Sequence, residues 1–355
     1  MILLQNVYYM LSYAFSVLRE DGYKSIATEE FEHIDELYAA ILERGITSQI
    51  KQGLGRDYVE HHEKLSSLRG KIDISDSLKS QSLLRHRLVC SFDEFSVDTP
   101  MNRIVKSTVE LLLRSGISKK RKKTLRKLLM YFSEVQTVDL RRVNWRVRYD
   151  RNNQTYRMLI AICYMASKRL LQSRREGSFR AMDFFQTDED MPRLYEKFIL
   201  EYFRQEHPEL KAHAPMVEWT LDDGFSDMLP TMRTDITLEA EDTVLIIDAK
   251  YYTNNTQQRF DSHTIHSGNL YQVFTYVKNK QVKVGSETKV SGMLLYAKTD
   301  SDIQPDATYS MSGNSIAVRT LDLNQPFPEI RAQLDGIADL YFPMSSALPP
   351  LPMSQ

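Results

Sequence analysis

The stretch TVLIIDAKY at residues 243–251 decides the fold of the C-terminal half of the chain. Four consecutive apolar residues, 244–247, predict a buried β-strand, and polar residues then follow at alternate positions. Because side chains alternate across a strand, Asp248 and Lys250 project from the same face. A carboxylate beside an ammonium at the end of an apolar strand is typical of metal-dependent nucleases. The acid can bind a hard cation, and the lysine can orient or deprotonate a water.

A second acid lies in a predicted partner strand at residues 232–239. If the two strands form a hairpin with an even-numbered loop around Glu241 and Asp242, Asp235 lies opposite Asp248, with Cβ atoms about 4.5–5.5 Å apart. Both carboxylates could then bind one metal ion, whereas a slip of one residue would put them on opposite faces. Glu-Asp is not a favoured two-residue turn, so a four-residue loop of the same parity stays open.

The helix predicted before this hairpin, at residues 190–205, adds a third acid. Glu196 falls inside the apolar arc of that helix. An acid on a packing face is costly unless it has a partner. A metal-bound water or the active-site lysine would supply one, and a structural salt bridge is the alternative.

The helix predicted after the hairpin, at residues 269–278, contributes an amide and a phenol. Gln272 and Tyr276 are four residues apart and share a face, with Asn269 adjoining. We expect this face to point away from the core, where it suits contacts to phosphate or to the lysine. His266 lies just before the helix and is expected on the DNA side of the site.

The composition indicates an ordinary globular protein of about two domains. The chain has 355 residues, of which 42% are apolar and 26% charged, which excludes a chain disordered throughout. Its 46 basic and 47 acidic residues nearly cancel. Two cysteines exclude a disulfide framework and a cysteine-based zinc site. Without a signal-peptide pattern or an apolar stretch of about 20 residues, a cytoplasmic protein that does not enter the membrane is expected.

Periodicity divides the chain at a polar stretch, 172–180. Residues 1–178 are expected to form an α+β N-terminal domain of helices and a small β-sheet. The predicted helices there are 5–18, 31–43, 102–113 and 155–172, and the predicted strands are 47–52, 57–61 and 88–95. Residues 179–341 follow as an α/β domain whose third strand is 290–297, and residues 342–355 as a flexible, proline-rich tail.

A basic segment, 114–127, carries eight Lys or Arg residues and no acid. It could contact DNA phosphates or an acidic surface on a partner protein, and a merely solvated helix face is the third possibility. As the partner-binding candidates we take its densest part, Lys119, Lys120, Arg121, Lys122 and Lys123.

The order of these polar residues resembles the PD-(D/E)XK nuclease superfamily, in the branch with a Gln-x-x-x-Tyr helix. The proline of the superfamily name is not adjacent here, because Pro230 lies five residues before Asp235. A wider resemblance, from about residue 5 to residue 340, is to the McrC family. It is carried by NVYYMLSYA (6–14), LRGKID (68–73), NRIVKST (102–108), LPTMRTDI (229–236), IIDAKYY (246–252) and NLYQ (269–272).

The resemblance implies a restriction-endonuclease-like domain with a central mixed sheet flanked by helices. It implies an Mg²⁺-dependent endonuclease with Asp235, Asp248 and Glu196 as metal ligands and Lys250 at the attacking water. Asn269, Gln272, Tyr276 and His266 would contact the DNA.

The partners that the resemblance implies are a McrB-like hexameric AAA+ GTPase, methylated double-stranded DNA and a second copy of the nuclease subunit. The N-terminal half would dock into the GTPase ring and stimulate GTP hydrolysis. The chain agrees in one respect: Gly70 and Lys71 are followed by Ile72, which is no Walker loop, so GTP would be bound by the partner.

Two other functions stay open. A stand-alone repair or recombination nuclease of the same superfamily would cut DNA with Mg²⁺ without a partner. A non-catalytic interaction subunit would bind and stimulate the GTPase without cutting.

Overall fold

The computed structural model describes residues 2–149, 153–172, 190–252, 256–259, 262–301 and 303–343. The chain forms two compact units, which we call the helical unit (Glu20–Arg180) and the sheet unit (Met1–Arg19 with Ala181–Gln355). No helix in the described part of the chain is both long and apolar enough to cross a bilayer. The predicted linker lies outside the described residues from residue 173 onward, and the tail does so from residue 344.

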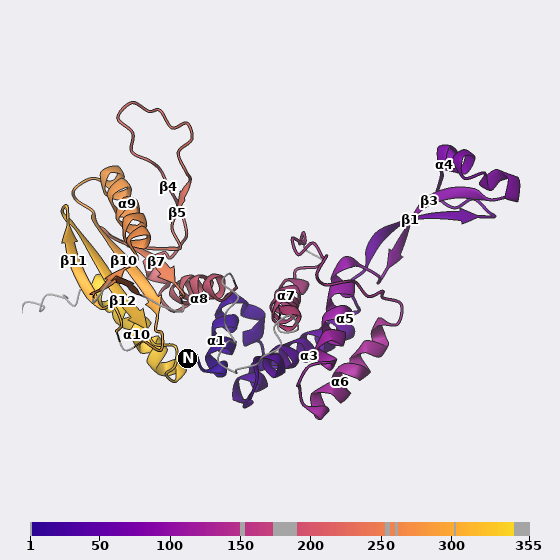
Figure 1. Ribbon diagram of the computed structural model, residues 1–355, viewed down its shortest axis with the longest axis horizontal. Helices are drawn as coiled ribbons and strands as arrows, with labels where there is room; N and C mark the ends of the chain where they lie inside the picture. Colours follow the sequence, from indigo (N-terminus) through magenta and orange to yellow (C-terminus); the bar gives the residue numbers. More distant parts are fainter. Residues whose placement is uncertain are drawn as a thin grey trace, which may run out of the picture. The chain divides into compact units, whose positions relative to one another are not determined.

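The sheet unit is built on a five-stranded mixed sheet with the order β11-β12-β10-β7-β6 (Figure 1). β7 pairs antiparallel with β6 and parallel with β10, and β12 pairs parallel with β10 and antiparallel with β11. The strands are β6 (Ile236–Ala240), β7 (Thr243–Lys250), β10 (Lys289–Ala297), β11 (Ala307–Met311) and β12 (Asn314–Leu321). Two small pairs accompany the sheet: β4 (Met216–Val217) with β5 (Met232–Arg233), and β8 (Thr256–Arg259) with β9 (Ser262–Ile265).

Both faces of this sheet are covered. Helix α9 (Ser267–Val284) joins β7 to β10 and packs on the face that Val244, Ile246 and Leu294 form. Helix α8 (Asp190–Glu206) packs against β6 and β7, and the β7 residues of the other parity are also buried. Burial on both faces is the usual setting of parallel pairs, and it explains why 244–247 is continuously apolar.

The N-terminal helix belongs to the sheet unit, so the predicted domain 1–178 is wrong for its first 19 residues. Helix α1 (Leu4–Ala14) packs on α8. The Asn6 amide donates hydrogen bonds of 2.8 Å to the carbonyls of Leu323 and Gln325, just before α10 (Phe327–Tyr341). An apolar stripe predicts a helix and its buried face, but it does not say which domain covers that face.

The helical unit combines helices with a three-stranded sheet, in the order β1-β3-β2. Figure 1 shows β1 and β3 as a long two-stranded arm that carries helix α4 at its end. Its helices are α2 (Asp21–Lys24), α3 (Ile34–Gln52), α4 (Ile74–Lys79), α5 (Pro100–Leu113), α6 (Lys119–Leu129) and α7 (Tyr156–Gln172), and its strands are β1 (Asp57–Leu65), β2 (Lys71–Ile72) and β3 (Leu88–Ser96).

The strand predicted at 47–52 is wrong, because α3 continues through it. Ile46 is fully packed, four residues after Leu42, so the helical stripe persists to this point. The helix ends where Gly53 takes a φ of 90°, a conformation that favours glycine.

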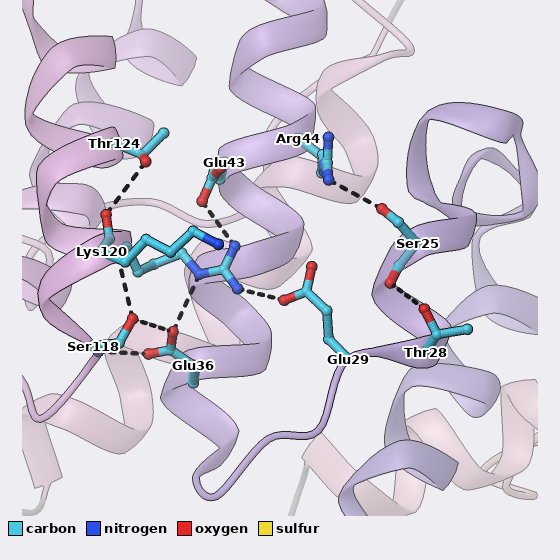
Figure 2. A network of polar contacts seen from close by, with 10 residues as sticks. Ser25, Thr28, Glu29, Glu36, Glu43, Arg44, Ser118, Lys120 and Thr124 are labelled. Atoms are coloured by element: carbon cyan, nitrogen blue, oxygen red, sulfur yellow. Dashed lines mark hydrogen bonds and ion pairs between the residues drawn. The ribbon is translucent and has the colours of Figure 1, made fainter.

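Arg121 anchors α6 to the helical unit. Its guanidinium forms ion pairs with Glu29 (2.6 Å), Glu43 (2.8 Å) and Glu36 (3.3 Å). Glu36 also accepts hydrogen bonds from the Ser118 backbone N–H and hydroxyl, at 2.8 and 2.7 Å (Figure 2). The side chain of Arg121 is only 13% exposed. Arg121, unlike its basic neighbours, is therefore engaged in ion pairs within its own unit and is not available to contact a partner protein.

We expect Arg121→Gln to lower the free energy of unfolding by about 2–3 kcal/mol, because three partly buried carboxylates lose their shared cation. Lys120→Gln, one position away on the exposed side, should change it by less than about 0.5 kcal/mol. Urea denaturation of the full chain measures both values. Equal stability of the two variants would show that the network contributes nothing.

Candidate active site

The β6–β7 hairpin has the even register that the sequence predicts. Ile236 pairs with Ile247 and Ala240 with Thr243, so the loop consists of only Glu241 and Asp242. Glu241 adopts a φ of 49°, which lets this unfavoured pair make a tight turn. Asp235 directly precedes β6, and extending the register by one residue would place it opposite Asp248.

Asp235, Asp248 and Lys250 meet at the end of β7. The Lys250 ammonium nitrogen lies 2.8 Å from Oδ2 of Asp248 and 3.8 Å from Oδ2 of Asp235. The same Asp235 oxygen accepts a 3.0 Å hydrogen bond from the backbone N–H of Ala249, which fixes that carboxylate against the strand. The arrangement brings two hard oxygen donors and one cation to one face of the sheet.

Asp248 is buried without adequate hydrogen bonds. Its side chain is 1% exposed, and neither carboxylate oxygen accepts a hydrogen bond within the described part of the chain. The contact with Lys250 is an ion pair by distance but lacks hydrogen-bond geometry. A buried carboxylate in this state is costly and lacks a ligand for its remaining lone pairs. A bound cation would supply that ligand.

The charges of the cluster shift the pKa of each member. Burial, opposed by the charge of Lys250 and assisted by the charge of Asp235, raises the pKa of Asp248 to about 7. Burial also raises the pKa of Asp235. Burial alone would lower the pKa of Lys250, but the two aspartates outweigh it, so its pKa is raised and the amine is held as an ammonium.

Glu196 on α8 stands near this cluster. Burial and then the charge of Asp235 raise its pKa to about 7, while Lys250 and Arg193 act in the opposite direction. Among the described residues, however, no three His, Cys, Asp or Glu side chains lie close enough to hold one metal ion. The structure thus joins Asp235 and Asp248 as a pair and leaves Glu196 outside direct contact. Two carboxylates suffice for Mg²⁺, which usually keeps several waters and binds substrate phosphates.

The prediction that the Gln-x-x-x-Tyr face points away from the core is wrong for Tyr276. This side chain is 7% exposed and packs in the core beneath α9 with Val273 and Val277. Its hydroxyl accepts a 2.8 Å hydrogen bond from Nε2 of Gln272, which is half-buried. Tyr276 belongs to the buried face of α9, because positions 269, 273 and 276 are spaced by four and three residues and so lie on one face of the helix.

Asn269 is also internal, contrary to its predicted contact with DNA. It is 9% exposed, its amide nitrogen donates to the Tyr296 hydroxyl (3.0 Å), and its amide oxygen accepts from the Tyr252 hydroxyl (3.2 Å). His266, the residue before α9, is half-buried, and its ring centroid lies 5.2 Å from that of Tyr252.

The sequence reasoning missed Tyr252 and Tyr296. Tyr252 continues the alternation of 248 and 250 and is 38% exposed at the edge of the site. Tyr296 is fully buried and pairs with Lys250 across the parallel β7–β10 ladder. The first could have been found by extending the alternation by one step. The second requires the parallel register, which no local pattern gives.

Comparison with known proteins places the chain in a family. Residues 4–297 match the family model described as "McrBC 5-methylcytosine restriction system component". The chain belongs to the McrBC family. A relative within it, the type IV methyl-directed restriction enzyme EcoKMcrBC of Escherichia coli K12, is 27% identical over 342 residues, which cover 95% of this chain and 97% of the relative.

Two solved structures resemble the McrBC-family chain described here. One is a half-complex of Thermococcus gammatolerans McrB AAA+ hexamers with bound McrC, with a TM-score of 0.47, 18% identity and coverage of 92% of this chain and 75% of that chain. The other, the cryo-EM structure of the Thermococcus gammatolerans McrBC complex, has a TM-score of 0.40, 22% identity and coverage of 57% and 59%.

If Asp248 is retained for ligand binding at the expense of stability, Asp248→Asn should not destabilise the metal-free chain. We expect its melting temperature in EDTA to equal or exceed that of the wild type, because the cost of desolvating the Asp248 carboxylate is removed while Asp235 still pairs with the Lys250 ammonium. Added Mg²⁺ should raise the melting temperature of the wild type only. Differential scanning calorimetry measures this, and a marked destabilisation of the variant in EDTA would contradict it.

Proposed function

We propose that this chain is the nuclease subunit of an McrBC-type, modification-dependent restriction system. The observation that carries the proposal is the Asp235–Asp248–Lys250 cluster at the end of β7 in a member of this family. Two carboxylates that share an ammonium at a strand end fit phosphodiester hydrolysis better than they fit a structural ion pair, because no described residue donates to the buried Asp248 oxygens the hydrogen bonds that a structural role would provide.

In this proposal Asp235 and Asp248 would hold Mg²⁺, which polarises the scissile phosphate and lowers the pKa of a bound water. The hard oxygen donors and the unsatisfied Asp248 oxygens fit that ion. Lys250, held as an ammonium between the carboxylates, would position the attacking water and stabilise the charge that develops on the phosphate.

Glu196 would act from α8. A carboxyl group whose pKa burial raises to about 7 can take up or release a proton near neutral pH, which suits a group that exchanges protons with a nearby water. Gln272, fixed by Tyr276, would orient the substrate strand, and His266 would face the DNA beside it.

The partner would be a McrB-like hexameric AAA+ GTPase that binds GTP and selects methylated DNA, and a second nuclease subunit would supply the cut in the other strand. The arm of the helical unit offers a docking element. Between β1 and β3 it exposes five large aliphatic side chains, each at least 44% exposed: Leu68, Ile74, Leu78, Leu83 and Leu84. Exposed apolar groups of this kind mark sites of protein interaction.

We expect Lys250→Ala to lower the cleavage rate of the assembled complex at least a hundredfold while GTPase stimulation stays intact, because the residue acts only at the phosphate. The measurement is cleavage of methylated plasmid with partner, GTP and Mg²⁺. Lys283→Ala, an exposed lysine of α9, is the control and should cut normally. Wild-type cleavage by Lys250→Ala would overturn the site. Robust cutting by the wild-type chain without any partner would favour a stand-alone nuclease.

The arm is tested by Leu78→Ser with Leu84→Ser. Both side chains are exposed, so the chain should fold normally but associate at least tenfold more weakly with the GTPase, and GTPase stimulation should fall in parallel. Analytical ultracentrifugation of the mixture measures association. Unchanged association would place the docking surface elsewhere on the chain.

A further inference from the structure

The solvent face of α6 carries a row of cations. Lys119, Lys120, Lys123, Arg126 and Lys127 are exposed, and none of them forms an ion pair with a described residue. Their neighbour Arg121 differs, because it forms ion pairs with three glutamates, Glu29, Glu36 and Glu43. In α6, therefore, Arg121 has a structural role, whereas the five exposed cations have no ion-pair partner among the described residues.

The inner face of α6 fixes which residues point outward. The Ser118 hydroxyl caps the helix by accepting from the Arg121 N–H at 3.2 Å, and Leu125 is fully buried one turn later. Lys119, Lys123 and Lys127 follow one another at intervals of four residues. They form a line of positive charge along the helix, with about one turn of 5.4 Å between neighbours.

This charge pattern costs stability. Like charges four residues apart destabilise a helix by about 0.2–0.5 kcal/mol per pair, and cations in the first turn oppose the helix dipole. The first turn of α6 contains no acidic residue to compensate. A pattern that breaks local rules without a compensating contact indicates selection for binding.

We propose that the outer face of α6 binds the phosphate backbone of duplex DNA. This inference rests on the proposed function for the identity of its ligand. The cores of protein interfaces are depleted of lysine and enriched in aromatic residues. A helix face that carries only basic residues and no acid is instead electrostatically complementary to a polyanion. Such contacts would hold DNA without regard to sequence while the nuclease cluster cuts.

The test measures binding of the full chain, without GTPase partner, to an unmethylated 30-bp duplex in EDTA, by fluorescence anisotropy over a range of salt concentrations. EDTA prevents cleavage. For the triple variant Lys119→Gln, Lys123→Gln and Lys127→Gln, we expect affinity at low salt to fall at least tenfold. The slope of log K against log salt should become shallower by about three, because each phosphate contact contributes about one.

Two controls separate charge from folding. Glutamine and arginine both have helix propensities close to that of lysine, so circular dichroism should be unchanged. The matched triple Lys64→Gln, Lys71→Gln and Lys79→Gln removes the same charge from exposed positions on the arm and should bind DNA as the wild type does. The triple Lys→Arg variant of α6 should retain both affinity and slope.

Three results would overturn the proposal: no measurable binding by the wild type, an unchanged salt slope in the α6 variant, or equal losses in both glutamine triples. If the α6 variant instead loses association with the GTPase while its DNA binding is unchanged, the surface belongs to the protein partner. A chain that never cuts DNA but shows the expected slope change would refute the nuclease function and leave this inference standing.

Discussion

The register between β6 and β7 is the constraint on which the site depends. Ala240 faces Thr243 across a two-residue loop, and that parity carries Asp235 to the face that holds Asp248 and Lys250. A shift by one residue would turn Asp235 to the other face, so that only one carboxylate would remain beside Lys250. The parallel β7–β10 pair then brings Tyr296 beside Lys250, and through it Asn269 at the start of α9.

The sheet unit shields this cluster from water, and the burial of the Asp248 carboxylate costs the unit stability. Packing on both faces of β7 removes water from Asp248, and the resulting desolvation raises the pKa of that carboxyl to about 7. The hydrogen bonds of Asn269 to Tyr252 and Tyr296 tie the first turn of α9 to the ends of two strands. Ordered supports around an incompletely satisfied carboxylate are what a binding site requires, because rigid neighbours keep the charge in place until a ligand arrives.

The features of the site that depend on residues close together in the sequence could be predicted from the sequence. The alternation after 244–247 gave the shared face of Asp248 and Lys250, and an even loop gave the register. The rest depends on tertiary contacts. The stripe of α1 does not reveal that α8 covers it. Tyr276 looks polar in sequence yet fills the core. Eight cations in 114–127 look alike, and only folding places Glu36 and Glu43, two turns apart on α3, around Arg121.

We propose that Asp235 and Asp248 together form one divalent-metal site. Electron paramagnetic resonance of Mn²⁺ added to the isolated full chain tests it without partner, nucleotide or DNA. We expect one bound ion for the wild type, loss of that ion in both Asp235→Asn and Asp248→Asn, and its retention in Glu196→Gln, because Glu196 stands outside the pair. Wild-type Mn²⁺ binding by both aspartate variants would show that the two carboxylates do not form the metal site.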